Sequence, residues 1–367
     1  MAPLTLPRFA AVTLLSLLLQ AAAPPKPADS IARVATLRSA RAAHTATALR
    51  SGHVLIVGGM GDGGGSLASV ELFDPTRNAI EEFGSLSEPR SGHTATLLGD
   101  GRVVIAGGYS GEYLRSIEVF DPVTRRFRSG GSLVEARSGH TANLLPTGRI
   151  LLVGGVGPGW TFLSSAEVYD PSTGRSESVG SMSVARESHT ATLLDDGNVL
   201  VIGGHRGRRP NMEVHARAEI FGAKTRRFEA AAALTTARHK HDAIRMADGR
   251  VLVVGGADRS DRTHYATTEI YTPRTATFEQ GPLMNNRRYK IAGTSVVLPN
   301  GDVLVAAGAR SAELLDIKTV AFREIPGSLR EAYRFAAAAP LPGGDVFIAG
   351  GYSDDNQNTG GVWRFRR

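Results

Sequence analysis

The strongest constraint in this sequence is a short pattern that repeats along most of the chain. A pair of glycines follows an apolar run again and again, at a spacing of about 49 residues. A fixed period of this length means that the fold is built from copies of one supersecondary unit. Seven units are present, if Ala307-Gly308 counts as a degenerate copy. The pairs begin at Gly58, Gly107, Gly154, Gly203, Gly255 and Gly350.

Each unit predicts four short strands. In the second unit, residues 93–98 alternate small and large side chains, and Asp100-Gly101 is a two-residue hairpin signal. The apolar run 103–106 predicts a second strand that is buried on both faces. Residues 117–122 predict a third strand, whose Asp-Pro turn leads into a fourth. Four-stranded units at this period are typical of propeller blades, so we predict an all-β, seven-bladed β-propeller.

The two ends of the chain are expected to close the ring together. The seventh unit has a third strand at residues 361–365 but no residues left for a fourth. At the other end, the segment 31–41 has the spacing of a fourth strand, with Ile31 and Leu37 before Arg41. We therefore expect the N-terminal strand to complete the last blade, which removes the open sheet edges that favour aggregation.

These features resemble the kelch-repeat family, in the subfamily similar to the central propeller of galactose oxidase. The Gly-Gly pairs, the Arg-x-x-His-Thr-Ala-Thr segments and the Asp-Pro turns carry the resemblance over residues 31–367. It implies a fold more than a function, because this fold hosts enzymes, adhesins and scaffolds. The copper-radical site of galactose oxidase requires a cysteine cross-linked to a tyrosine, and this chain has no cysteine. We therefore expect neither that copper site nor any other cofactor.

The N-terminus predicts export. Arg8 supplies a basic residue, and the apolar residues 9–23 end in three alanines, as at a signal-peptide cleavage site. No cysteine is present for lipid attachment. We predict a signal peptide at 1–23, a short linker at 24–30 and a single propeller domain at 31–367. The mature protein is expected to be a secreted or periplasmic monomer with no membrane span.

A histidine recurs at one position near the start of five units. Five imidazoles at one level could bind a transition metal. However, the position becomes Gly293 and Ala336 in the last two units, and ring neighbours are too far apart to share one ion. We interpret the row as structural, with each histidine bonded to backbone at the blade entrance, and expect no metal. Its members are His44, His93, His140, His189 and His241.

An arginine precedes each of these histidines by three residues, and a glutamate recurs on the third strand. A carboxylate buried between blades needs a partner, so we predict Arg–Glu pairs within or between blades. In the sixth unit the arginine position falls to Lys290 or Arg287, because the spacing to Leu283 and the spacing to the glycine pair disagree. The two rows are Arg41, Arg90, Arg137, Arg186 and Arg238, and Glu71, Glu118, Glu167, Glu219, Glu269 and Glu313.

The loops between the second and third strands differ from unit to unit, and all are expected on one face of the ring. Aromatic and arginine side chains on loops over a rigid scaffold are typical of binding surfaces. Ordinary solvated loops are the alternative. The candidate ligand-binding residues are Tyr113, Trp160, Phe162, Arg206, Arg208, Arg209, Arg259, Arg262 and His264.

We interpret the chain as a binding module for a protein or glycan ligand on this face, and the arginines favour an anionic ligand. The net charge of +7 is scattered, which does not indicate nucleic-acid binding. A sugar-acting isomerase or lyase with a site at the channel mouth is the main alternative. Such an enzyme needs an acid/base pair, for which His264 with Asp258 or Asp261 is the local candidate. A purely structural surface protein is the third hypothesis.

Overall fold

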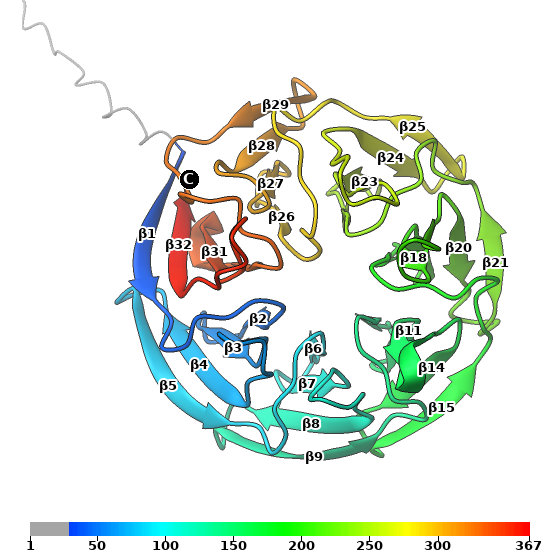
Figure 1. Ribbon diagram of the computed structural model, residues 1–367, viewed down its shortest axis with the longest axis horizontal. Coiled ribbons are helices and arrows are strands. Elements are labelled where there is room, and N and C mark those ends of the chain that lie inside the picture. Colours follow the sequence, from blue (N-terminus) through cyan, green and yellow to red (C-terminus); the bar gives the residue numbers. More distant parts are fainter. Residues whose placement is uncertain (1–28) are drawn as a thin grey trace, which may run out of the picture.

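The computed structural model describes residues 29–367, which form a ring of seven four-stranded antiparallel sheets (Figure 1). This confirms the predicted seven-bladed propeller. The first four blades contain, from the axis outward, β2 (Thr45–Ala48), β3 (Val54–Val57), β4 (Ser69–Asp74) and β5 (Ala79–Ser85); β6 (Thr94–Leu97), β7 (Val103–Ala106), β8 (Ser116–Asp121) and β9 (Arg126–Ser132); β10 (Thr141–Leu144), β11 (Ile150–Val153), β14 (Ala166–Asp170) and β15 (Arg175–Val179); and β16 (Thr190–Leu193), β17 (Val199–Ile202), β20 (Ala218–Phe221) and β21 (Phe228–Ala231).

The last three blades follow the same order. Their strands are β22 (Asp242–Arg245), β23 (Val251–Val254), β24 (Thr268–Thr272) and β25 (Thr277–Gln280); β26 (Ser295–Val297), β27 (Val303–Val305), β28 (Glu313–Asp316) and β29 (Ala321–Glu324); and β30 (Ala337–Pro340), β31 (Val346–Ala349), β32 (Gly361–Arg366) and β1 (Ser30–Thr36). Within residues 29–367, no helix has the length and apolar character needed to cross a membrane.

The N-terminal strand closes the ring, as predicted. Strand β1 pairs antiparallel with β32 and is the outermost strand of the seventh blade (Figure 1). Ile31 and Leu37 are both buried, and Ile31 packs with the core between the last two blades. The predicted signal peptide lies outside the described residues, so its prediction stands as an expectation.

The hydrophobic core lies between blades rather than within them. Leu55 and Val57 of β3, for example, pack with Val103 and Ile105 of β7 in the neighbouring blade. Both strands are fully buried, which explains why the second strand of each unit is apolar without alternation. Because each blade covers the faces of its neighbours, the ring gains its stability from the whole set of blades.

The turn between the first two strands is longer than the predicted two-residue hairpin. The Leu98 N–H donates to the Arg102 carbonyl across 2.8 Å, and the Gly101 N–H donates to the Leu98 carbonyl across 3.0 Å. Three residues therefore form the loop, and Gly101 has a φ of +92°, a left-handed conformation that glycine adopts without strain. The Asp-Gly pair marked the turn correctly but not its length.

The sixth blade is shifted by one residue from the predicted register. Leu283 is 60% exposed, whereas Met284 is 4% exposed and occupies the buried position. Counting from Met284 places Arg288 in the arginine row, so neither Lys290 nor Arg287 fills it. Three residues after Arg288, Ile291 occupies the histidine position of this blade in place of the predicted Gly293, which had been placed from the glycine pair; Ile291 is fully buried.

The predicted Arg–Glu pairs are all present. In the second blade, Arg90 Nη2 donates to Glu118 Oε1 across 3.0 Å and Arg90 Nη1 donates to the Gly107 carbonyl across 2.9 Å. The second carboxylate oxygen accepts the Ser87 N–H, from the segment that arrives from the first blade. Each pair therefore lies within one blade and also fixes the connection to the previous blade. The six pairs are Arg41–Glu71, Arg90–Glu118, Arg137–Glu167, Arg186–Glu219, Arg238–Glu269 and Arg288–Glu313.

Four of the five row histidines join neighbouring blades through threonine hydroxyls, not through the expected backbone contacts. His93 Nε2 lies 3.1 Å from Thr45 Oγ1 of the preceding blade. Burial lowers the pKa of His93 to about 3, so its imidazole is neutral near pH 7. Between residues 29 and 367, no group of three or more His, Cys, Asp or Glu could hold a metal ion. The same contact joins Thr94 to His140, Thr141 to His189 and Thr190 to His241.

Candidate functional site

The central channel opens on the face that carries the loops between second and third strands, here called the b–c face. One residue of each blade, two positions after the repeated arginine, has a left-handed backbone at this opening. Hydrogen bonds join neighbours in this collar, such as Lys290 N–H to the Lys240 carbonyl at 2.8 Å. The collar surrounds the mouth of a channel of about 610 Å³. Its residues, with φ between 51° and 64°, are Ala43, Gly92, Gly139, Ser188, Lys240, Lys290 and Phe335.

The side chains of the collar are not equivalent around the ring. They are small in the first four blades, cationic in the fifth and sixth, and aromatic in the seventh. Reasoning from sequence missed Lys240 and considered Lys290 only as a stand-in for the repeated arginine. The sequence does contain a signal for Lys240: the residue just before each row histidine is small in the first four units and lysine in the fifth.

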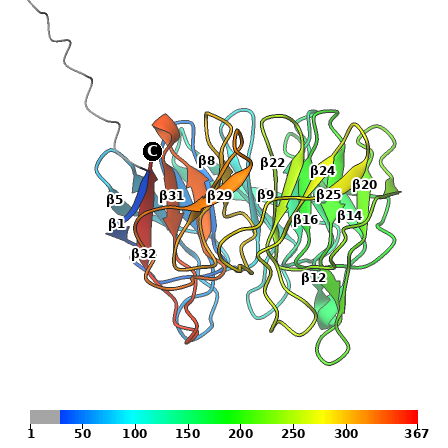
Figure 2. The ribbon, with the colours of Figure 1, turned by 90° about the horizontal axis from the view of Figure 1, so that it is seen from above.

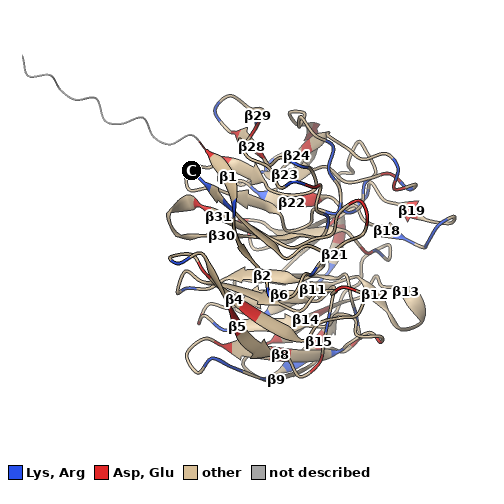
Figure 3. Cartoon of the chain, turned by 60° about the vertical axis from the view of Figure 1, so that its left-hand side comes forward, with Lys and Arg blue, Asp and Glu red and all other residues tan. Residues whose placement is uncertain are grey.

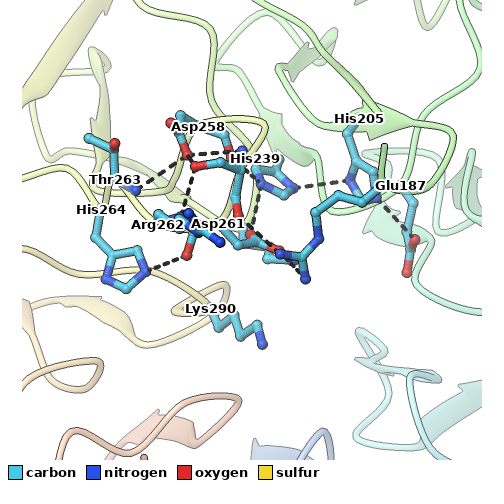
Figure 4. A network of polar contacts seen from close by, with 12 residues as sticks. Glu187, His205, His239, Asp258, Asp261, Arg262, Thr263, His264 and Lys290 are labelled. Carbon is cyan, nitrogen blue, oxygen red and sulfur yellow. Dashed lines mark hydrogen bonds and ion pairs between the residues drawn. The ribbon is translucent and has the colours of Figure 1, made fainter. Parts of the chain in front are cut away.

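A polar network joins the fourth blade to the fifth along one side of the mouth (Figure 4). Lys240 Nζ lies 2.9 Å from both carboxylate oxygens of Asp261. The same carboxylate is 3.1 Å from His239 Nε2, and His239 Nδ1 is 3.2 Å from His205 Nδ1. At the far end, His205 Nε2 lies 3.7 Å from Glu187. Burial, together with His239 and Lys240 nearby, lowers the pKa of His205 to about 3; burial raises the pKa of Glu187.

Lys290 lies beside this network in an aromatic surrounding. Its Nζ is hydrogen-bonded to the Tyr352 hydroxyl. It also lies 5.2 Å from the ring centre of Tyr289, 5.4 Å from that of Phe335 and 5.1 Å from that of Tyr352. Burial lowers the pKa of the Lys290 amine, and Asp261 offsets part of this effect.

A second cluster, here called the aromatic cluster, brings three of the candidate residues together from neighbouring blades. The ring centres of Tyr109 and Tyr113 are 5.1 Å apart, and that of Trp160 is 5.7 Å from Tyr113. The Arg208 guanidinium lies 3.5 Å from the centre of the Trp160 ring. Trp160 is 52% exposed, on the turn η1 (Pro158–Trp160) between β12 (Val156–Gly157) and β13 (Thr161–Phe162), which project from the b–c face (Figure 2).

The other predicted arginines do not converge on one point. Arg206 pairs with Glu213 at 2.8 Å across the hairpin of β18 (His205–Arg206) and β19 (Glu213–Val214), which extends from the ring (Figure 3). Arg209 donates to the Ser260 carbonyl across 3.1 Å and so joins the loops of the fourth and fifth blades. Arg259 and Arg262 are exposed. Of the predicted aromatics, Phe162 lies 5.6 Å from the His205 ring, beside the polar network.

The expected acid/base pair at His264 is not formed. His264 Nε2 lies 3.1 Å from the backbone carbonyl of Asp261, not from its carboxylate. The His264 ring stacks on Tyr289 with centres 3.7 Å apart. Asp258 accepts the N–H and the hydroxyl of Ser260 and so shapes its own loop. The charged partner of Asp261 is Lys240, which the sequence analysis did not consider.

Comparison with known proteins agrees with this architecture. The kelch motif family matches residues 89–133 and 137–183, which are most of the second and third blades. The chain is a seven-bladed β-propeller with kelch motifs in its second and third blades. Among solved structures, this propeller is similar to a fungal alcohol oxidase of the AA5 family in complex with copper, with a TM-score of 0.69 and 16% identity over 91% of this chain and 75% of that chain. No curated protein matches the chain.

One feature of the galactose oxidase resemblance does not carry over to this propeller. The chain contains no cysteine, so the cross-linked cofactor of galactose oxidase cannot form. At 16% identity, the similarity to that oxidase shows a shared fold and no more.

Proposed function

We propose that this kelch propeller is an exported binding module that holds a protein or glycan ligand on its b–c face. The observation that carries the proposal is the aromatic cluster with Arg208 stacked on Trp160. Its residues come from three blades, and none of them belongs to the repeat. Since the repeated residues are used for folding, specificity falls to the residues that vary.

The cluster has the composition of a binding hot spot. Tryptophan, tyrosine and arginine are the residues most enriched where interfaces gain their affinity, because they combine large contact area with polar ends. Trp160 is half-exposed although it is large and apolar, and Arg208 already fixes the orientation of its ring. An anionic ligand can contact Arg208 and the exposed Arg262 without displacing an existing carboxylate partner.

The test is a binding screen with the full chain, using a glycan array and chemical cross-linking in conditioned culture medium. Each ligand found is then measured against Trp160→Ala and Arg208→Ala. Both variants are expected to weaken binding, because they remove the two faces of one stacked pair. Val123→Ser is the matched control: Val123 is 90% exposed in a turn on the opposite face, so its loss should leave affinity unchanged. Equal binding by all three variants would place the ligand elsewhere.

A sugar-acting isomerase or lyase is the second candidate, and one observation favours it. Burial raises the pKa of Glu187 and lowers that of Lys290, and both side chains line the same channel mouth. A carboxyl group whose pKa is raised and an amine whose pKa is lowered both move toward neutral pH, where they can serve as acid and base in one site. Glu187→Gln would then abolish turnover of a bound sugar while leaving its affinity intact. A ligand that the full chain binds and leaves chemically unchanged excludes this candidate for that ligand.

A further inference from the structure

The cations at the channel mouth differ in whether the fold supplies them with a counter-charge. Lys240 contacts both oxygens of Asp261 at 2.9 Å, and Arg334 pairs with Asp354. Lys290 has no such partner: among residues 29–367, no carboxylate oxygen lies within 4.0 Å of its Nζ. Figure 4 shows Lys290 apart from the Asp261 network, with no contact drawn to it.

The amine of Lys290 nevertheless lies in a place that withdraws it from water. Three aromatic ring centres are within 5.4 Å of Nζ, and the Tyr352 hydroxyl accepts one of its N–H groups. Ring faces attract a cation but do not replace two missing hydrogen-bond acceptors. A partly desolvated ammonium without a counter-charge is costly, so an anion placed beside it gains more than it would at an exposed lysine.

The channel offers the space for such an anion. Lys290 and Phe335 line its mouth together, and across the opening the collar has Gly92 and Gly139, which leave the entrance free of bulk. The channel volume of about 610 Å³ is in the range of about 300–1,000 Å³ that is usual for small-ligand pockets.

We propose that Lys290 binds a carboxylate group of the ligand at the channel mouth, and that Phe335 contacts the apolar face of the ring that bears this carboxylate. The proposal rests on the ligand-binding function proposed above and names the chemical class: an acidic sugar or a similar ring carboxylate. One uncompensated cation matches a monoanion. A phosphate, which carries more charge, would leave part of that charge unpaired because Lys240 is already neutralised by Asp261.

The experiment measures small probes on the full chain by isothermal titration calorimetry at moderate ionic strength. Glucuronate is the main probe, and glucose is its neutral counterpart. Acetate tests a carboxylate without a sugar ring, and inorganic phosphate tests a different anion. Glucuronate is expected to bind more tightly than glucose by about tenfold or more, because glucose has no carboxylate to pair with the ammonium charge of Lys290. If acetate binds at Lys290 as tightly as glucuronate, the carboxylate site is supported, but the contact between Phe335 and the sugar ring is overturned.

Two variants locate the site. Lys290→Met keeps the length of the side chain and is expected to weaken glucuronate binding by about tenfold or more. Arg206→Met is the matched control, because Arg206 is an exposed cation on the same face whose charge is already paired with Glu213; its loss should change affinity by less than about threefold. Equal melting temperatures would show that both variants fold.

The proposal is overturned if Lys290→Met binds glucuronate as the unaltered chain does, or if phosphate competes as well as glucuronate. It is also overturned if no carboxylate probe binds. In that last case, a ligand from the screen whose binding still depends on Trp160 and Arg208 would support the binding function although the carboxylate site is wrong. Failure of the carboxylate site is therefore distinguishable from failure of the proposed function.

Discussion

Arg288 Nη2 donates to Glu313 Oε1 across 2.9 Å, and both side chains are fully buried. The carboxylate also accepts the backbone N–H groups of Asn285 and Asn286, which belong to the segment arriving from the fifth blade. Burial alone would raise the pKa of Glu313, but Arg288 and these hydrogen bonds outweigh it and hold the pKa below its usual range. The repeated arginine and glutamate therefore have a structural purpose: they connect each blade to the one before it.

The first prediction is that Glu118→Ala destabilises the fold. The variant leaves the buried Arg90 guanidinium with only the exposed Glu88 carboxylate 3.5 Å away, at an expected cost toward the lower end of about 3–5 kcal/mol in the free energy of unfolding. Denaturant unfolding with urea measures this. Glu81→Ala is the control, since Glu81 is an exposed partner of Arg77. If the two variants unfold at the same urea concentration, the buried pair does not stabilise the blade.

The fold could be predicted almost completely because the repeat samples each position seven times. Glycine pairs, apolar runs and the Ile31–Leu37 spacing all point to the same ring, and errors in one unit are corrected by the others. The sixth blade is the exception. Leu283 and Met284 are adjacent and both apolar, so the sequence alone does not show which of them is buried, and the arginine position moved with that choice.

The candidate site could be predicted only in part, for a physical reason. Trp160 and Arg208 were identified because aromatic and arginine side chains on variable loops indicate binding. Their stacking depends on how far two loops of different blades lean toward each other, and a repeat says nothing about that. Lys240 was missed because it lies inside a repeated segment, and the residues of such segments are expected to have structural roles only.

The second prediction is loss of stability in mild acid through the histidine row. The pKa of His93 is about 3 in the folded chain, below the ordinary value of about 6.5. The unfolded chain therefore binds more protons below pH 6.5, and the stability present above that pH is lost as pH falls toward 3. Each such histidine removes about 1.4 kcal/mol per pH unit in this window. The carboxylate of Glu313 has a lowered pKa, so it loses its stabilising contribution only below its ordinary value of about 4.5, outside the range from pH 7 to pH 5.

Urea unfolding at pH 7, 6 and 5 measures this effect. His93→Ile is the matched variant, because the sixth blade already has Ile291 at the equivalent buried position. It is expected to lose less stability between pH 7 and pH 5 than the unaltered chain, by the contribution of one histidine. A free energy of unfolding that stays constant from pH 7 to pH 5 would contradict the neutral, buried state of the row.

The third prediction concerns the seam between the seventh and first blades. Within residues 29–367, neither ring nitrogen of His44 has a hydrogen-bond partner, because Ala337 occupies the position that is threonine in the first four blades. Ala337→Thr should supply the missing hydroxyl and raise the free energy of unfolding by about 0.5–1.5 kcal/mol. Ala337→Val adds the same bulk without the hydroxyl. The hydrogen-bond explanation fails if the two variants are equally stable.

The last prediction concerns the contribution of three arginines of the fourth and fifth blades to the binding of an anionic ligand. Arg208, Arg209 and Arg262 belong to adjoining loops, and Arg209 already links those loops through the Ser260 carbonyl. Replacing all three with Ala is expected to weaken binding of an anionic ligand and to flatten its dependence on salt, because exposed charges are screened beyond about 8–10 Å at moderate ionic strength. The salt dependence separates this effect from lost packing on Trp160, which is insensitive to salt.

Titrations at two ionic strengths measure both the affinity and its salt dependence. Arg206→Ala is the control, because Arg206 is a cation on the same face whose charge is paired with Glu213. Unchanged affinity in the triple variant, with an intact fold, would leave Tyr109, Tyr113 and Trp160 as the contact surface and would exclude the arginines from recognition.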